Sequence, residues 1–564
     1  MAVSRVEERI LCAFGLSSSA RVEFESSQTV PVGGVMLLLP FLLDCGLLTY
    51  RNHYSQRLKG FYNFDNLLII IAFIYLCRIK SFEQIKKYSP GEFGKLVGYD
   101  RIPEIRTLRR MVDEITSQNR SEQWAASLSR SWIAQETPEL YYIDGHVQVY
   151  HGYLANLGKK HVSRQRLCLP GMMEFWVNSS QGSPYFFVTA DVNEKLQEML
   201  SDEIIPELIR LHPVSEERKK LMEANADEPL FTIVFDREAY SPKFFAKLWN
   251  EYRIAVITYR KNVKDKWDEA LFKEHTVTSS FGTEEKMNLC EQSYICENCR
   301  MREIRKSGKE NHQTSIVTTN KILKIEQIAS SMFDRWSQEN FFRYMRQEYA
   351  LDKIIQYSVD ELDGEIMVVN REYSNITYKI KKSREKLGRR KIQKYEIEQK
   401  NPMQEESEKE NKKWYKQCVK LTEEIQLMEK EIEELLTKRK SISTKIPLSQ
   451  MPEAIRYNTL NQESKYLQNI IKMICYRAET ALAALLSPHY KRADQEIRTL
   501  IKSVINTPTN MEVDKEKKLL KITLYPLANN RSNEAVGKIC EKVNQTNTEY
   551  PGTNLRLLFK IATS

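Results

Sequence analysis

Glycine, proline and cysteine are scarce in this sequence, whose 564 residues include 19 Gly, 18 Pro and 10 Cys. So little Gly and Pro excludes a collagen-like or broadly disordered chain and favours long helices. The cysteines are spread unevenly along the chain, so we expect reduced thiols rather than a disulfide framework. The first residues lack a basic stretch followed by an apolar core and a small-residue cleavage site, so nothing in them indicates export. We therefore expect a cytosolic protein.

Long apolar runs are also missing. The run Val35–Leu43 is interrupted by Pro40, and the run Leu67–Cys77 is about half as long as a membrane helix requires. We expect both to be buried helices and expect no membrane partner. Neither of the common phosphate-binding loops, Gly-x-x-x-x-Gly-Lys-Ser/Thr or Gly-x-Gly-x-x-Gly, stands between a strand and a helix. This argues against an ATPase or a dinucleotide-dependent enzyme.

The residues that are present are typical of a globular protein, with 41% hydrophobic, 10% aromatic and 28% charged side chains. The length exceeds what one core usually holds, so we expect about three or four structural units. The formal net charge is +10, from 85 basic and 75 acidic residues. This excess can attract a polyanion, but it only permits DNA binding and does not by itself indicate it.

The first quarter of the chain has no strand pattern. Residues 1–28 are polar and are expected to form an irregular or loosely docked arm. Residues 29–135 are helical, with short helices separated by Pro and Gly. This rhythm suits a helix-turn-helix in which Thr107, Arg109 and Arg110 begin a helix that contacts DNA. A plain helical packing domain is the alternative.

The pattern of residues 138–260 is that of strands and helices in the order strand, strand, strand, helix, strand, helix, strand. Residues 262–320 are polar and strand-like without a clear core, and we interpret them as a β-rich insertion. A helix is expected from Leu323 to about Tyr349. The prediction is a multidomain α/β protein whose mixed sheet, within residues 136–352, has the strand order of an RNase H-like core.

Residues 365–448 are charged and helical. Apolar residues with spacings 4,3,4,3,4,3 form a heptad seam in this segment, which consists of Trp414, Cys418, Leu421, Ile425, Met428, Ile432 and Leu435. Such a seam predicts either an antiparallel helical hairpin or an intermolecular coiled coil. Lys379–Lys394 is dense in basic residues, so Lys382, Arg389 and Arg390 are candidate contacts to the DNA backbone. A solvated helix face is the alternative. Residues 450–564 are expected to form a small α+β region.

Three acidic residues stand out against this background. Asp144 lies within a strand, Asp236 ends the buried strand Leu230–Phe235, and Glu339 lies on the later helix. In an RNase H-like sheet the first and fourth strands are neighbours, so the two aspartates can meet and a helix packed across them can deliver the glutamate. Three carboxylates without a Cys or His ligand set suit Mg²⁺, which Mn²⁺ can replace. Two such ions, about 3.5–4 Å apart, support phosphodiester cleavage.

These segments resemble the bacterial insertion-sequence DDE transposases whose acidic helix carries the signature Tyr-x2-Arg-x3-Glu-x6-Lys. The matching residues are Met332, Arg335, Glu339 and Arg346, so Met replaces the Tyr and Arg replaces the Lys. Tyr142–His146 resembles the strand of the first Asp, and Phe235–Glu238 that of the second.

The resemblance implies a metal-dependent DNA transposase whose catalytic and metal-binding residues are Asp144, Asp236 and Glu339. It also implies that Trp336 supports the acidic helix, and the candidate DNA contacts near the acids are Arg335, Arg346, Arg343 and Arg237. The implied partner is double-stranded DNA, the implied assembly a homodimer or larger, and the implied location bacterial, cytoplasmic and nucleoid-associated.

Several alternatives stay open. The chain can be an inactive or domesticated transposase that only binds DNA, or a coiled-coil scaffold. Cys290, Cys296 and Cys299 with His312 can bind zinc, or can be free thiols in a loop. His146 and His151 near Asp144 can be metal ligands or a general base, although a two-metal site requires neither.

Overall fold

The computed structural model describes residues 5–54, 58, 60–150, 157–162, 167–279, 282–297, 299–308, 312–333, 335–351, 359–361, 367–399, 408–450, 458–460, 462–490 and 494–562. The chain divides into two compact units. One comprises residues 1–152, 157–358 and 461–564, and the other residues 153–156 and 359–460. The helical N-terminal region, the strand-rich middle and the C-terminal region, expected as separate domains, therefore share one unit.

The N-terminal region is built from short helices and one apolar helix, α3 (Phe64–Leu76). Helix α3 begins after Asn63, whose side chain accepts a hydrogen bond from the N–H of Asn66 (2.8 Å). All its residues except Asp65 are buried, as expected of a helix that is apolar on every side. The other helices of the region are α1 (Val6–Ala13), α2 (Leu39–Asp44), α4 (Pro90–Lys95), α5 (Ile105–Thr116) and α6 (Ser121–Glu136), with the shorter turns η1 (Gly33–Leu38), η2 (Thr49–Asn52) and η3 (Phe82–Lys87).

Of the irregular or loosely docked arm expected for the first 28 residues, the irregular form is wrong, because the segment contains α1 and the start of strand β1 (Ser27–Val30). Arg9 forms an ion pair with Asp100 and lies 3.8 Å from the ring centre of Phe61. Polar residues thus dock this segment, which is why its composition suggested no structure. The stretch Gly33–Asn52 is long and apolar enough to cross a membrane by length and composition alone, and 67% of its apolar window is buried inside the fold, as in a core helix.

One ten-stranded mixed sheet dominates the larger unit, in the order β3-β4-β2-β6-β7-β11-β10-β9-β8, with β5 beside β4. Strand β4 is antiparallel to both β2 and β5, whereas β6 is parallel to both β2 and β7. The fold is therefore mixed α/β, as predicted. The bounds are β2 (Leu140–Val149), β3 (Lys159–Val162), β4 (Leu167–Asn178), β5 (Pro184–Asp191), β6 (Phe231–Phe235) and β7 (Ile254–Tyr259), with the intervening helices α7 (Leu196–Met199), η4 (Leu200–Ile204), α8 (Ile205–Leu211), α9 (Glu216–Ala224) and α10 (Pro242–Tyr252).

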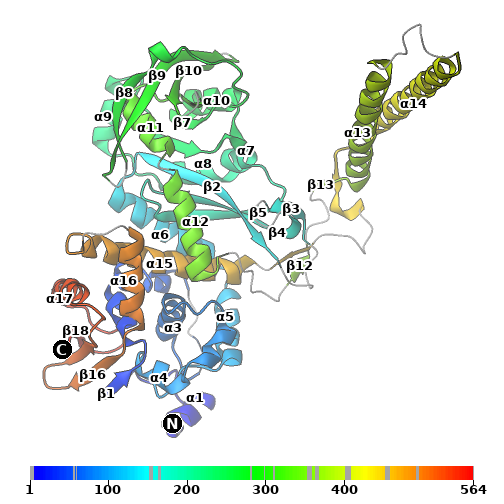
Figure 1. Ribbon diagram of the computed structural model, residues 1–564. Helices are drawn as coiled ribbons and strands as arrows, with labels where there is room; N and C mark the ends of the chain where they lie inside the picture. Colours follow the sequence, from blue (N-terminus) through cyan, green and yellow to red (C-terminus); the bar gives the residue numbers. More distant parts are fainter. Residues whose placement is uncertain are drawn as a thin grey trace. The chain divides into compact units, whose positions relative to one another are not determined.

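Side-chain alternation gives the sheet two covered faces. Ile143 and Phe235 belong to the main core, which includes residues of α6, α8 and α10. Tyr142 and Val234 point the other way and pack with Met332 of α11 (Ile325–Phe333). Helix α12 (Trp336–Tyr349) crosses β2 (Figure 1). Residues two positions beyond Tyr142 and Val234 therefore belong to the face that α11 covers.

The insertion extends the same sheet and buries Val277, Met287 and Leu289 against Ala329 of α11, in contrast to the expectation. Arg305 is fully buried, lies 4.2 Å from the ring centre of Trp267, and forms ion pairs with Glu303 (2.7 Å) and Asp265 (2.6 Å). Because a charged residue fills a buried position of this strand, its sequence resembles that of a polar strand. The strands are β8 (Lys273–Thr278), β9 (Glu284–Cys296), β10 (Cys299–Ser307) and β11 (Gln313–Thr318), preceded by the turn η6 (Glu269–Leu271).

The C-terminal region is part of the core rather than an appended tail. Helix α15 (Gln462–Leu486) packs against α2, α3, α5 and α6. Its buried charges are matched: Lys465 pairs with the fully buried Glu174 (2.9 Å), and Arg477 pairs with Glu136. A four-stranded sheet joins both ends of the chain in the order β1-β16-β17-β18 (Figure 1). The remaining elements are α16 (Asp494–Asn506), β16 (Thr509–Asp514), β17 (Leu519–Leu524), α17 (Asn530–Asn544) and β18 (Arg556–Ile561).

The second unit is a helical hairpin, which is the first of the two arrangements that the heptads predicted. Helices α13 (Arg371–Gln399) and α14 (Glu408–Lys440) pack antiparallel: Trp414 Nε1 donates to the carbonyl of Ile397 (2.9 Å), and Lys438 pairs with Glu372 (3.4 Å). The most buried described side chains of the two helices lie on the seam and are Ile376, Ile380, Leu421, Ile425 and Ile432. The unit also contains the antiparallel pairs β12 (Val359–Glu361) with β15 (Asn458–Leu460) and β13 (Met367–Val369) with β14 (Lys445–Pro447), and the turn η8 (Leu448–Gln450).

Candidate active site

Two aspartates follow the paired residues of neighbouring parallel strands. Strands β2 and β6 are in register up to Ile143 and Phe235, so Asp144 and Asp236 occupy the next position on each. Strand β2 continues through Asp144, whereas Asp236 begins the short turn η5 (Arg237–Ala239). Neighbouring strands lie about 4.8 Å apart, and the carboxyl ends of parallel strands are where α/β sheets place their ligands. The sheet thus brings the two acids to one edge.

Backbone N–H groups orient both carboxylates. The Oδ1 atom of Asp144 accepts a hydrogen bond from the N–H of Gly145 (2.9 Å), and the Oδ1 atom of Asp236 accepts one from the N–H of Arg237 (2.8 Å). Each acid keeps its second oxygen for another partner.

Glu339 lies in the first turn of α12. Helix α11 ends at Phe333 and α12 begins at Trp336, so the single helix expected from Leu323 to Tyr349 is two helices. The signature residues are divided accordingly. Met332 is fully buried at the end of α11 and packs in the core, whereas Glu339 and Arg346 belong to α12. The Tyr of the signature therefore corresponds here to a core position.

Two side chains hold the first turn of α12 on the sheet. The Ser337 hydroxyl donates a hydrogen bond to the carbonyl of Ser180 (3.0 Å). The fully buried Gln338 amide donates to the carbonyls of Tyr142 (3.2 Å) and Trp176 (3.4 Å), on β2 and β4 respectively. Glu339 follows these anchors directly, and its side chain is 57% exposed. The side chain of Trp336, expected to support this helix, lies outside those that the structure describes.

Arg335 connects the acids. Its guanidinium lies 3.6 Å from Asp144 and 3.2 Å from Glu339, and its side chain is only 15% exposed. The pKa of Asp144 is raised to about 6, chiefly because the group is buried; Arg335 opposes this rise, and the charges of Asp236 and Glu339 add to it. The three acids and the arginine therefore interact as one electrostatic cluster.

Tyr259 also belongs to this cluster, although no sequence motif selects it. Burial raises its pKa, Arg335 lowers it, and the charges of Asp236 and Glu339 raise it. Strands β6 and β7 pair up to Val234 and Ile257, so Tyr259 stands two residues further along β7, as Asp236 does along β6. Only the register between these two strands identifies it.

The donor set of this cluster suits a hard cation. Carboxylate oxygens are the ligands that Mg²⁺ and Mn²⁺ prefer. Within the described part of the chain, no three His, Cys, Asp or Glu side chains lie close enough together to hold an ion as they stand. Arg335 supplies the positive charge that balances Asp144 and Glu339 instead. His146 stacks on Phe342, with ring centres 4.9 Å apart, and His151 lies outside the described residues.

Comparison with known families identifies the class of protein. The family model described as Transposase protein, Transposase_29, matches residues 1–563. The chain belongs to this transposase family. Transposases are in general enzymes that cleave and transfer DNA.

No curated protein matches the sequence of this transposase. Among solved structures it is similar to a piggyBac transposase in the cryo-EM structure of a synaptic complex with hairpin DNA, with 11% sequence identity and a TM-score of 0.27. The similarity covers 57% of this chain and 64% of that chain, less than two thirds of the latter's length.

The remaining arginines near the acids differ in exposure. Arg237 and Arg343 are exposed, beside Asp236 and one turn beyond Glu339 respectively. Arg346 is half-buried, and its Nε donates to the carbonyl of Phe342 (3.2 Å). Arg346 lies seven residues beyond Glu339, or about 10 Å along the helix axis. These side chains can therefore meet successive groups of an extended ligand.

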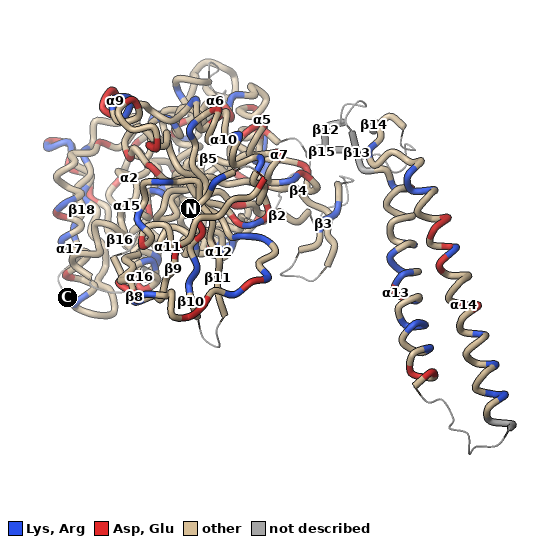
Figure 2. The backbone as a smooth tube through the Cα atoms, turned by 90° about the horizontal axis from the view of Figure 1, so that it is seen from above, with Lys and Arg blue, Asp and Glu red and all other residues tan. Residues whose placement is uncertain are grey.

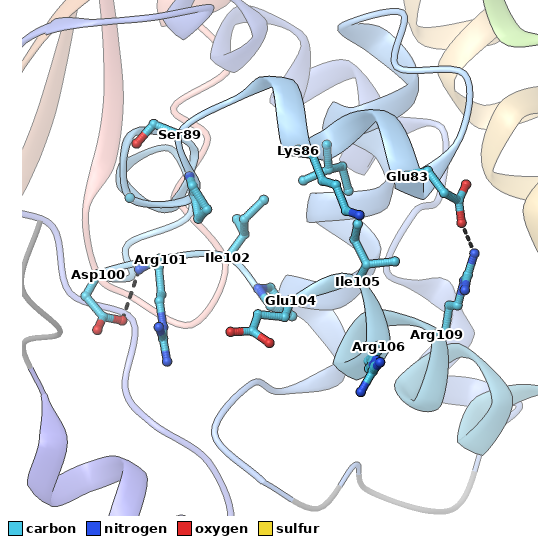
Figure 3. A pocket seen from close by; sticks show the side chains of 14 residues that line it. Glu83, Lys86, Ser89, Asp100, Arg101, Ile102, Glu104, Ile105, Arg106 and Arg109 are labelled. Atoms are coloured by element: carbon cyan, nitrogen blue, oxygen red, sulfur yellow. Dashed lines mark hydrogen bonds and ion pairs between the residues drawn. The ribbon is translucent and has the colours of Figure 1, made fainter.

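The candidate DNA contacts of the N-terminal region lie on α5. Arg109 forms an ion pair with Glu83 at one side of a cavity of about 650 Å³, and Arg106 also lines this cavity (Figure 3). Arg110 is exposed, and Thr107 lies one turn before it. Nine residues separate α4 from α5, which is longer than the three- or four-residue turn of a helix-turn-helix. Arg109 is thus engaged within the fold.

The cysteines of the insertion do not form a zinc site. Cys296 and Cys299 are paired neighbours on β9 and β10, but Cys290 lies six residues away along β9. Six residues of a strand span about 20 Å, so the three sulfur atoms cannot share one ion. All three are free thiols.

Proposed function

We propose that this transposase is of the DDE type and that Asp144, Asp236 and Glu339 are its catalytic, metal-binding residues. The observation that carries the proposal is the common register position of Asp144 and Asp236, with Glu339 in electrostatic contact with Asp144, in a chain of the transposase family. The reaction would be phosphodiester hydrolysis and transesterification, supported by Mg²⁺ or Mn²⁺. The finer assignment to the insertion-sequence group, and with it a bacterial cytoplasmic location, is part of this proposal.

The strand order supports an RNase H-like core. Three antiparallel strands, β2, β4 and β5, are followed by β6 and β7, which run parallel to β2, in the spatial order β5-β4-β2-β6-β7. In this order β2 and β6, the first and fourth strands of the core, are neighbours. Two acids on these strands can form a pair only if the strands are neighbours.

The chemistry of the donor set fits two divalent cations, held by Asp144, Asp236 and Glu339. When bound, such ions activate an attacking oxygen and stabilise the leaving oxygen of an in-line displacement. The protein's own part is to orient the carboxylates through Gly145 and Arg237, and to hold Glu339 over β2 through Gln338. Arg335 must release Asp144 and Glu339 when a cation takes its place, and its guanidinium can then bind a DNA phosphate.

The proposed roles of the other arginines near the acids follow from the exposure of their side chains. Arg237 and Arg343 would bind phosphates beside the scissile position, and Arg346 would bind one further along α12. We further propose that the chain acts on transposon-end and target DNA as a homodimer or larger assembly. The alternative, an inactive DNA-binding descendant of a transposase, has the same fold and differs only in its chemistry.

The test is cleavage of DNA that carries the element's own flanking ends, by the full chain, with Mg²⁺ or Mn²⁺. Nicking that requires metal and disappears in Asp236→Ala, while DNA binding is retained, is the expected result. Asp227→Ala is the matched control, because Asp227 is half-exposed and pairs with Lys321 away from the cluster. Binding without cleavage by the unmodified chain favours the inactive alternative, and cleavage by Asp236→Ala at the normal rate rejects the assigned site.

A further inference from the structure

The hairpin carries a concentration of positive charge that the catalytic proposal leaves unused. Residues 379–394 of α13 include nine Lys or Arg and one acid, Glu385. The nearby part of α14, residues 423–434, has the opposite composition, with six Glu and one Lys. Figure 2 shows Lys and Arg recurring along the middle of α13. The hairpin therefore has a strongly basic helix beside a partly acidic one.

Only part of this charge is neutralised within the hairpin. Arg390 pairs with Glu424 (3.3 Å) and Lys391 pairs with Glu429 (2.7 Å). These ion pairs connect α13 to α14. Arg390 and Lys391 are therefore engaged within the hairpin. Arg390, one of the DNA contacts suggested by the sequence, is thus a structural ion-pair partner within the hairpin.

Four other cations form a continuous line, which we call the basic stripe: Lys379, Lys382, Lys386 and Arg389. Their spacings of 3, 4 and 3 residues place them on one face of α13, over about 15 Å of helix. All four are exposed. Among the described residues, no carboxylate forms an ion pair with any of them, and Lys382 lies only over the ring of Tyr378 (4.9 Å).

We propose that the basic stripe is a binding surface for the phosphate backbone of double-stranded DNA, separate from the catalytic cluster. The identification of the ligand as DNA rests on the proposed function. Three of the four cations are lysines, which bind phosphates as flexible point charges. Contacts of this kind fix the position of DNA without reading its sequence. The hairpin is therefore a sequence-independent DNA-holding arm.

Charge and burial disfavour the other ligands. A second copy of the hairpin would bring an equal positive stripe together with its acidic α14, in which Glu424 and Glu429 are already paired within the hairpin. Insertion into a membrane surface uses a continuous apolar face, whereas the most buried apolar side chains of α13 and α14 lie against each other in the seam. Exposed apolar side chains such as Tyr378, Ile392 and Leu427 remain, so vesicle binding is one of the outcomes of the test. A duplex carries about one negative charge per 1.7 Å of its axis, which gives every cation of the stripe a partner.

The experiment measures binding of the full chain to a fluorescent random-sequence DNA duplex at several salt concentrations. The test variant changes the four stripe residues to Gln, and the control changes four exposed lysines of the larger unit, Lys220, Lys515, Lys517 and Lys538, to Gln. Both variants lose the same charge. The slope of log affinity against log salt concentration is negative, and its magnitude is expected to decrease by about 3–4 in the stripe variant. Binding should be at least about tenfold weaker at moderate salt. The control should keep the slope of the unmodified chain.

An unchanged slope in the stripe variant overturns the proposal, as does an equal change in the control. Circular dichroism at the helix bands confirms that the hairpin is intact, as expected because the four side chains lie outside the seam. Loss of binding to vesicles of phosphatidylcholine and phosphatidylserine, with the DNA slope unchanged, would assign the stripe to a membrane instead. Because the readout is binding, it is independent of whether Asp236→Ala abolishes cleavage, so the two proposals can fail separately.

Discussion

Asp144 and Asp236 occupy the register position immediately after Ile143 and Phe235, the last pair of two parallel strands. The pairing of Ile143 with Phe235 keeps the backbones of the two acids at neighbouring positions. Their charges therefore repel in the absence of a cation, and the raised pKa of Asp144 reflects this repulsion in addition to burial. Arg335 offsets part of it by contacting Asp144 and Glu339.

We expect Asp144→Asn to raise the thermal stability of the metal-free chain above pH 6. The folded-state pKa of about 6 lies above the ordinary value of 3.8, so folding favours the protonated acid. The contribution of the Asp144 carboxyl group to the free energy of unfolding is largest below pH 3.8 and decreases as the pH rises to about 6. Above that pH it stays at its low value. The melting temperature of the Asn variant minus that of the unmodified chain should therefore grow between pH 4 and 6 and level off at about 2–4 °C.

The measurement is thermal unfolding in chelator across this pH range, with Asp227→Asn as the exposed control. Adding Mn²⁺ at neutral pH should reverse the order, because the unmodified carboxylate binds the ion and the amide binds it less well. A difference that shrinks with rising pH in chelator would contradict the electrostatic account.

Arg335→Ala should strengthen the binding of divalent metal by the chain without DNA. The guanidinium is the positive charge that a cation has to displace, so its removal leaves the carboxylates without a competitor. We expect the apparent affinity for Mn²⁺ to rise about tenfold, as measured by calorimetric titration. Arg343→Ala is the control, since Arg343 is exposed one turn beyond Glu339. Weaker Mn²⁺ binding in Arg335→Ala would show that the arginine helps to assemble the site.

The sequence predicted those parts of the site that depend on local periodicity. Runs of apolar residues indicated β2, β6 and β7, with Asp144 inside the first of these strands and Asp236 at the end of the second. The heptad seam of α14 is equally local, and its buried residues are the ones expected. The contribution of Tyr259 depends on register between strands, which no local pattern contains.

Buried charges explain most of the remaining differences. Lys465 and Arg477 look like surface residues in the sequence, but their partners, Glu174 and Glu136, lie about three hundred residues away. The helix that carries them was therefore assigned to a small tail. The break between Phe333 and Trp336 was missed for a different reason: α11 and α12 are both amphipathic and follow each other closely, so their patterns merge.

Gln338→Leu should slow cleavage about 10–100-fold while leaving DNA affinity within about twofold. The amide bridges the carbonyls of Tyr142 and Trp176 and so fixes the residue before Glu339. Leu fills similar space without these hydrogen bonds, so α12 can shift over β2. The Mn²⁺ concentration for half-maximal cleavage should rise, which a loss of stability alone would not cause. Gln347→Leu, at an exposed position of α12, should leave both quantities unchanged. Equal rates for the two variants would exclude a positioning role.

Glu479→Gln should destabilise the larger unit by about 3 kcal/mol, because it removes the fully buried one of the two carboxylates that pair with the guanidinium of Arg78. Glu479 is fully buried, forms an ion pair with Arg78 and accepts a hydrogen bond from Tyr344 of α12 (2.9 Å). Arg78 also pairs with Glu348 of α12 (2.9 Å), so this network ties the helix of Glu339 to α15 and to the end of α3. Urea unfolding measures the loss, and Glu274→Gln, which breaks an exposed pair with Lys286, should cost less than about 1 kcal/mol. Hydrogen exchange should locate the weakening: amides of α12 and α15 exchange faster in Glu479→Gln, whereas those of the hairpin do not. Uniform acceleration in both units would mean that the network stabilises the whole chain and does not specifically hold α12.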